Sequence, residues 1–113
     1  MHQTYKDKIL KAKDIDTITT GKRLGHPVRS LKSPFSRDLF KKEYDSSISD
    51  EELEAMGSGA LRLAAIEGDE RNGCFLAGQI ASMCNREQPA AQMIEEIFAE
   101  AQTILNGASK WVK

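Results

Sequence analysis

The clearest hydrophobic pattern in the chain predicts a long amphipathic helix from about residue 90 to residue 105. Apolar residues recur there every three or four positions, whereas three glutamates fall on the opposite side. The apolar positions are Ala90, Met93, Ile94, Ile97, Phe98, Ala101, Ile104 and Leu105, and the glutamates are Glu95, Glu96 and Glu100. Pro89 suits the first helical position and Gly107 suits a C-terminal stop. We expect the tail that follows to dock through Trp111.

A capping box predicts a second helix in the middle of the chain. Ser49 is placed to cap its N-terminus, and Glu52 is placed to reach back to the cap. Apolar and small residues then follow at helical spacing, and Gly68 is expected to end the helix. They are Leu53, Met56, Gly57, Ala60, Leu61 and Ala64. The small residues among them would let a neighbouring backbone approach closely.

Shorter elements are predicted in the first half of the chain. We expect a helix over residues 4–12 with Thr4 as N-cap, and strands over residues 14–20 and 26–32. A helix capped by Ser36 is expected to run to Tyr44. Because the first helix starts with nothing before it to pack against, we expect that a segment upstream is missing. The fold class expected is mainly α with a small two-stranded β element (α+β).

The stretch from residue 73 to residue 81 is apolar and rich in glycine, and it follows a turn over residues 68–72. It is expected to lead into a short buried helix that ends near Cys84. A glycine-rich turn brings backbone close to another group. That group is either a second helix, packed through Ala77 and Gly78, or a ligand near Gln79, the one polar residue of the stretch.

Length and composition limit the chain to one ordinary soluble domain. It has 113 residues, of which 40% are hydrophobic and 29% are charged. We expect residues 1–113 to form a single lobe, with a helix, short strands and a linker in residues 1–48 and a helical part in residues 49–113. No apolar run reaches the length of a membrane span, and no secretory signal begins the chain. Cytoplasmic localisation is therefore expected.

Charge and cysteine content exclude several kinds of site. The net charge is −1, which gives no overall field for holding nucleic acid. Basic residues gather between Lys6 and Lys42, where they either face an acidic partner or form a solvated surface. Cys74 and Cys84 lack metal-ligand partners at suitable spacing, so we expect reduced cysteines on buried helix and no metal site.

Few residues offer chemistry by themselves. His2 and His26 have no nucleophile or carboxylate beside them in the sequence, and the acidic run of residues 50–52 is explained by a helix N-terminus. The glycines of residues 57–59 lie within a helical pattern, so they do not form a dinucleotide-binding loop. Gln79 and its neighbours therefore remain the principal candidates.

Several separate blocks of the sequence resemble one enzyme family. The blocks are His2-x-x-Tyr5-Lys6-x-Lys8-Ile9-Leu10-Lys11-Ala12-x-Asp14-Ile15-Asp16-Thr17, Gly25-x-x-Val28-Arg29-x-Leu31, Met56-Gly57-x-Gly59-Ala60-Leu61 and Gly68-Asp69-x-x-x-Gly73-x-x-x-Ala77-Gly78-Gln79-Ile80-Ala81. In this order they resemble the C-terminal third of the flavin-dependent (type II) enoyl-acyl-carrier-protein reductases and the nitronate monooxygenases, formerly called 2-nitropropane dioxygenases. The last block is the most specific.

The resemblance implies a lobe beside an FMN-binding TIM-type barrel. The flavin-phosphate loops, the catalytic histidine and most barrel strands of that family would precede the part represented here. FMN and NAD(P)H are therefore implied for the full-length family, but this chain alone is expected to bind neither and to carry no catalytic residue. The missing barrel, in the same chain or in a separate one, is an expected partner, as is an acyl-carrier-protein or CoA thioester.

The resemblance also implies site residues. Cys74, Leu76, Ala77, Gly78 and Gln79 would form part of the substrate-cavity wall near the flavin. Leu76 occupies a position that is often methionine, and Cys74 one that is usually a small hydroxyl residue. Arg29 matches a recurring arginine, for which a structural salt bridge and a carrier-protein contact stay open.

The functional hypotheses are an enoyl-acyl-carrier-protein reductase fragment, a nitronate monooxygenase fragment, and a catalytically silent helical module for interaction or assembly. The opening Tyr5-Lys6 block favours the reductase. Exposed stripes over residues 57–64 and 94–105 lead us to expect self-association.

Overall fold

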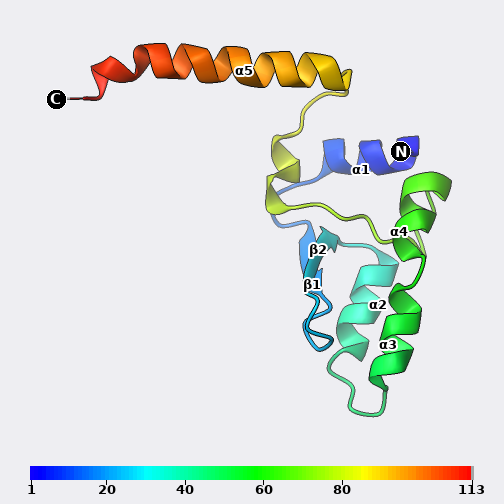
Figure 1. The fold of residues 1–113 in the computed structure, drawn as a ribbon. Coiled ribbons are helices and arrows are strands. Elements are labelled where there is room, and N and C mark those ends of the chain that lie inside the picture. Colours follow the sequence, from blue (N-terminus) through cyan, green and yellow to red (C-terminus); the bar gives the residue numbers. More distant parts are fainter. Residues whose placement is uncertain (113) are drawn as a thin grey trace.

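A computed structural model describes residues 1–112 as a body of short elements from which one long helix projects (Figure 1). The helices of the body are α1 (Gln3–Lys11), α2 (Pro34–Lys42), α3 (Asp50–Gly57), α4 (Ala60–Arg62), the π-helical turn η1 (Leu63–Glu67) and the 3₁₀ turn η2 (Gln79–Met83). The strands are β1 (Thr17–Thr20) and β2 (Val28–Leu31), and the chain continues into α5 (Ala90–Gly107) and η3 (Ala108–Lys110). The predicted fold class, mainly α with a small two-stranded β element, is confirmed.

The two strands form an antiparallel hairpin in which Thr17 lies opposite Leu31 and Thr20 opposite Val28. Both strands are shorter than predicted. Before β1, the backbone N–H of Lys13 donates to the Asp16 carboxylate at 2.9 Å, which holds that segment in a turn. Before β2, the N–H of His26 donates to the Gly21 carbonyl and closes the hairpin loop.

The predicted caps of the first two helices are each wrong. His2 caps α1 in place of Thr4, since its Nδ1 accepts the Thr4 backbone N–H at 3.2 Å. Ser33 caps α2 in place of Ser36, and the two serines form a reciprocal capping box across Pro34 at the first position. Pro34 has no backbone N–H to satisfy, so the helix begins one turn earlier than expected.

The capping box of Ser49 and Glu52 at the start of α3 is confirmed. The helix that follows is not continuous, however, because Gly59 adopts a left-handed conformation (φ +75°) and separates α3 from α4. The backbone then passes through the π-helical turn η1. As predicted, the helix ends at Gly68, which has φ +66°. The imidazole of His2 lies against Gly68, so a side chain there would collide with it.

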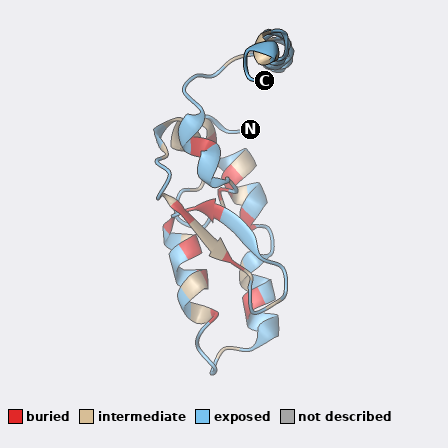
Figure 2. Cartoon of the chain, turned by 90° about the vertical axis from the view of Figure 1, so that its left-hand side faces the viewer, coloured by how far each residue is buried: buried red, intermediate tan, exposed pale blue. Residues whose placement is uncertain are grey.

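The core lies where α1, β2 and η1 meet, and buried residues are coloured red along the chain in Figure 2. Tyr5, Leu31, Ala64 and Phe75 form it, with the rings of Tyr5 and Phe75 5.0 Å apart. Ala60 and Ala64 are buried within the body, which leaves them unable to form the predicted association stripe. Gly57 has open space around it instead of a close neighbour.

The long helix α5 is confirmed, but its ends differ from the prediction. Pro89 is the N-cap residue, and Gly107 is the last helical residue in a right-handed conformation that lets the backbone continue into η3. Trp111 is 87% exposed, so the expected docking of the tail is wrong; Lys113 lies outside the described residues.

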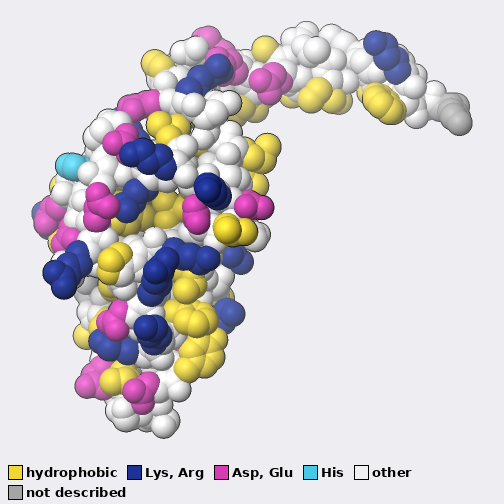
Figure 3. All heavy atoms as spheres, turned by 180° about the vertical axis from the view of Figure 1, so that it is seen from behind, with side chains coloured by type: hydrophobic (Ala, Val, Ile, Leu, Met, Phe, Trp, Pro, Cys, Tyr) yellow, Lys and Arg dark blue, Asp and Glu magenta, His cyan; other side chains and the backbone are white. Residues whose placement is uncertain are grey.

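No residue of α5 is buried. Its apolar side chains appear along one edge of the projecting helix in Figure 3. The linker before it is tied to the body by Glu87, which accepts hydrogen bonds from Lys6 and Gln3. Arg86 and Gln88 of the same linker donate to Glu96 in the first half of the helix. None of the helices in residues 1–112 combines the length and apolar composition needed to cross a bilayer.

Gly73→Ala is expected to lower the free energy of unfolding by about 2 kcal/mol, because overpacking of a tight site costs that order of energy. A Cβ at this position would lie 2.4 Å from the Asp69 carbonyl oxygen and 2.9 Å from the Ala64 Cα. Gly78→Ala is the matched control, since nothing lies within 4 Å of its Cβ position. Urea denaturation followed by circular dichroism measures both variants, and equal stabilities would contradict the packing described here.

Candidate functional site

The segment over residues 74–77 runs extended along β2 instead of forming the start of a helix. The Leu31 N–H donates to the Phe75 carbonyl at 2.8 Å, and the Ala77 N–H donates to the Arg29 carbonyl at 3.2 Å. On the other side, the Cys74 N–H donates to the Ala60 carbonyl at 2.9 Å. The predicted helix is therefore confined to the short η2 turn, because the edge of β2 already satisfies the backbone groups of the segment.

Extended backbone sends successive side chains to opposite faces. Phe75 is completely buried in the core, whereas Leu76 is 36% exposed on the other face. Ala77 packs against the core, and Gly78 and Gln79 are exposed. The structure thus keeps the residues implied as a cavity wall together in one segment, with Leu76, Gly78 and Gln79 open to the outside.

The prediction of close helix packing through Gly78 is wrong, since nothing lies within 4 Å of the place that a Cβ would occupy there. The close approach occurs five residues earlier, at Gly73, whose backbone lies against Ala64 and Asp69. The sequence contained a signal for this contact, because Gly73 directly precedes the apolar run. It did not show which of the two glycines faces a neighbour.

Tyr5 holds the segment over residues 74–77 in place through a hydrogen bond. The sequence pattern indicated Tyr5 only as an apolar residue on one face of a helix. Its phenolic O–H donates to the Leu76 carbonyl at 2.7 Å and fixes the backbone between Phe75 and Ala77. Burial is the main cause that raises the pKa of the Tyr5 hydroxyl, with a smaller contribution from Cys74. The group therefore remains a protonated hydrogen-bond donor at neutral pH.

The two cysteines occupy different surroundings, and neither lies on a buried helix as predicted. Cys74 is half-buried in the extended segment, and Cys84 is exposed after η2. Burial raises the pKa of the Cys74 thiol, and a contact with the Ser30 hydroxyl opposes this shift to a smaller extent. Cys74 is therefore a protonated thiol at neutral pH, with little nucleophilic character.

Arg29 is exposed on β2, and its Nη1 donates to the Thr17 hydroxyl at 3.1 Å across the hairpin. Within residues 1–112 no ion pair of Arg29 is found. A partner contact for Arg29 stays a prediction. Of the two histidines, His2 caps α1 and His26 is exposed in the hairpin loop. No group of three His, Cys, Asp or Glu side chains gathers to hold a metal ion in the part of the chain described.

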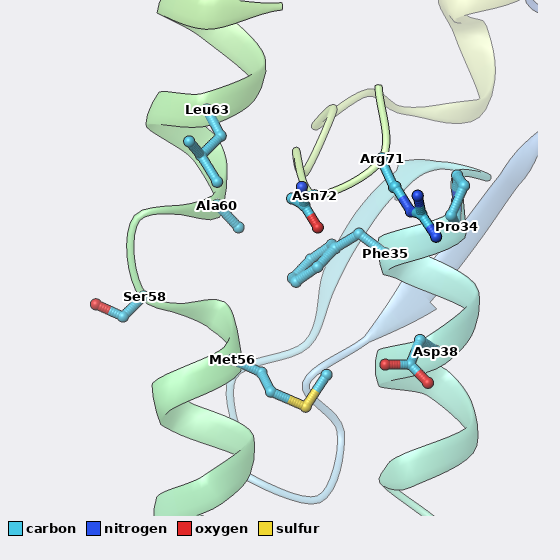
Figure 4. A pocket seen from close by; sticks show the side chains of 9 residues that line it. All are labelled: Pro34, Phe35, Asp38, Met56, Ser58, Ala60, Leu63, Arg71 and Asn72. Carbon is cyan, nitrogen blue, oxygen red and sulfur yellow. The ribbon is translucent and has the colours of Figure 1, made fainter. Parts of the chain in front are cut away.

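A hollow of about 460 Å³ lies between α2 and the α3–α4 pair (Figure 4). Phe35 points into it from α2 and Met56 reaches it from α3, while Arg71 and Asn72 lie above. None of the residues predicted to line a substrate cavity reaches this hollow. It separates packed helices and does not extend the candidate site.

Comparison with known proteins finds that the chain is similar to one part of longer proteins. No protein-family profile matches it. A solved structure of FabK from Thermotoga maritima superimposes on 98% of the chain with a TM-score of 0.88 and 37% identity. The chain resembles the C-terminal part of the type II enoyl-acyl-carrier-protein reductase family. A structure of a methionine-to-alanine mutant of the same FabK matches with a TM-score of 0.77 and 34% identity.

A curated relative is a probable nitronate monooxygenase from Staphylococcus saprophyticus, 30% identical over 92% of the chain. The chain spans about a third of each relative, 29% of the monooxygenase and 35% of the FabK chain. The resemblance predicted from the sequence blocks is therefore confirmed, including its restriction to one part of a longer protein. Both relatives support a flavin-dependent oxidoreductase family.

Thiol labelling tests the surroundings assigned to the two cysteines. At about pH 8 a chromogenic disulfide reagent is expected to modify Cys84 at least about tenfold faster than Cys74, because burial hinders the reagent and each unit of raised pKa removes about nine tenths of the thiolate. Cys84→Ser should leave only the slow reaction, which accelerates as the pH rises toward the raised pKa, and Cys74→Ser only the fast one. Equal rates for the two variants would contradict the assignment.

Proposed function

We propose that this chain is the C-terminal lobe of an FMN-dependent enoyl-thioester reductase that resembles the enoyl-acyl-carrier-protein reductases of fatty-acid synthesis. In the whole enzyme NAD(P)H would give a hydride to FMN, and the double bond of an enoyl thioester would then be reduced. The observation that carries the proposal is the FabK superposition, which extends over 98% of this chain at 37% identity.

This chain by itself offers at most one wall for a flavin. The sheet within residues 1–112 has two strands, whereas a TIM-type barrel assembles its site from loops that follow eight strands. The exposed side of the segment over residues 74–79 supplies an apolar side chain from Leu76, bare backbone at Gly78 and an amide at Gln79. In the whole enzyme these groups would border the substrate and exclude water from it. No step of the reaction is assigned to a residue of this chain, and we propose that the isolated chain is inactive.

The missing barrel, in the same or a separate chain, is the partner that we propose for α5. On α5, Ile94, Ile97 and Phe98 are between 56% and 72% exposed to solvent. An exposed apolar stripe of this kind normally packs against another surface. The FabK match covers 98% of this chain, a span that includes residues of α5, and it belongs to a chain about three times as long. In the absence of a barrel the same stripe would drive self-association.

Two alternatives remain. A nitronate monooxygenase fragment is supported by the Staphylococcus relative, whose identity of 30% is lower than the 37% of FabK. A catalytically silent interaction module is supported by the absence of a nucleophile-base pair among the candidate residues described above. An acyl-carrier-protein or CoA thioester is the proposed substrate carrier only under the reductase proposal.

Chimeric enzymes distinguish these possibilities. The corresponding part of Thermotoga maritima FabK, and separately that of the Staphylococcus monooxygenase, would be replaced by this chain. We expect the FabK chimera to retain NADH- or NADPH-dependent enoyl-thioester reduction within about tenfold of FabK, because the backbone that borders the site is shared. The monooxygenase chimera should be less active on alkyl nitronates relative to its parent.

The control is each barrel without any C-terminal lobe, which should be inactive. Greater retention of activity by the monooxygenase chimera would favour the nitronate alternative. If both chimeras retained FMN and neither turned over substrate, the silent module would be favoured and the reductase proposal would be wrong.

A further inference from the structure

A hollow of about 340 Å³ between α1 and α2 is surrounded by basic side chains. Lys8 and Lys11 come from α1, Lys32 follows β2, and Arg37 comes from α2. Buried Leu31 and half-buried Ala12 contribute apolar surface to it, and Asp16 is its single acidic residue. Basic side chains gather over the middle of the body in Figure 3.

Four other hollows formed by the described residues do not repeat this charge distribution. The hollow between α2 and α3 has one arginine and one aspartate, and the hollow beside α5 has one arginine and two glutamates. A hollow next to Lys42 has one lysine and one glutamate, and a hollow between α1 and the linker before α5 has one lysine, one arginine and one glutamate. The chain as a whole carries a net charge of −1. The excess of cations between α1 and α2 is therefore local and does not follow from the overall composition.

The cations of this hollow are only partly neutralised. Lys8 pairs with Glu70 at 2.8 Å, whereas the Lys32 ammonium donates to the uncharged Ile15 carbonyl at 2.6 Å. For Lys11 and Arg37 no ion pair is found within residues 1–112. The Asp16 carboxylate accepts the Lys13 backbone N–H and so is engaged in a local turn.

We propose that this hollow binds a phosphate-bearing anion, with Arg37 and Lys11 as its principal ligands. The guanidinium of an arginine offers paired donors that match phosphate oxygens, and lysine ammonium groups add point charges that stabilise a multivalent anion. The basic side chains around the hollow come from α1, from the residue after β2 and from α2, and they surround one small volume. This arrangement suits a compact anion better than the extended surface of an acidic polypeptide. The site is independent of the flavin proposal, since none of its residues belongs to the segment over residues 74–79.

Inorganic pyrophosphate is the probe, titrated into the full chain and followed by amide chemical shifts at constant ionic strength. Shifts are expected around residues 8–12 and 31–37. Arg37→Gln and Lys11→Gln should each weaken binding by about tenfold, because each removes a charge-assisted hydrogen-bond donor. Lys110→Gln removes the same charge far along the sequence, in η3, and should change the affinity less than about twofold. Circular dichroism verifies that each variant keeps its fold.

The source of the phosphate is distinguished by a second titration with adenosine diphosphate. Equal affinities for the two probes would indicate recognition of the phosphate groups alone, and tighter binding of the nucleotide would indicate a nucleotide-borne diphosphate. The proposal would be wrong if no saturable shift appeared, if Lys110→Gln weakened binding as much as Arg37→Gln, or if a poly-glutamate peptide bound the same residues more tightly than pyrophosphate.

Discussion

The backbone pairing between β2 and the segment over residues 74–77 is the interaction on which the rest of the structure depends. A two-stranded hairpin is marginally stable in water, and this segment gives β2 a second neighbour. The same pairing buries Phe75 completely, and burying a side chain of this size contributes about 2 to 3 kcal/mol. Tyr5 then connects α1 to the segment through both its ring and its hydroxyl.

Features that depend on residues close together in the chain could be predicted from the sequence. The capping box at Ser49 and the apolar stripe of α5 depend on residues three to four positions apart, so the sequence contained all the information needed to place them. The resemblance of the Gly68–Ala81 block also identified the segment that lies beside β2. Its conformation could not be predicted in the same way. The partner of Phe75 is Leu31, more than forty residues away, and local periodicity does not report such a contact.

The wrong predictions at helix ends have a similar cause. Ser36 is a suitable cap by residue type, but Pro34 favours a start one turn earlier and Ser33 lies at the correct distance to cap it. Gly107 is a frequent stop signal, yet it remains helical, and Trp111 and Val112 beyond it are exposed. Cys74 was expected within a buried helix, and its half-buried position instead follows from the edge pairing of its neighbours.

The candidate site and α5 both leave apolar surface exposed, which the proposed barrel would cover. Leu76, Gly78 and Gln79 form an open edge, and α5 extends its apolar stripe away from the body. In the FabK structure a similar backbone belongs to a chain about three times as long. Under the proposed function, the site would be one wall, and a barrel would supply its opposite side.

The visible absorption spectrum of the purified chain, recorded after incubation with FMN and removal of free ligand, tests this conclusion most directly. We expect no flavin band, together with a helical circular dichroism spectrum that shows a folded chain. A stoichiometric flavin band would show that residues 1–113 build a complete flavin site, which would contradict the proposal that this lobe requires a barrel.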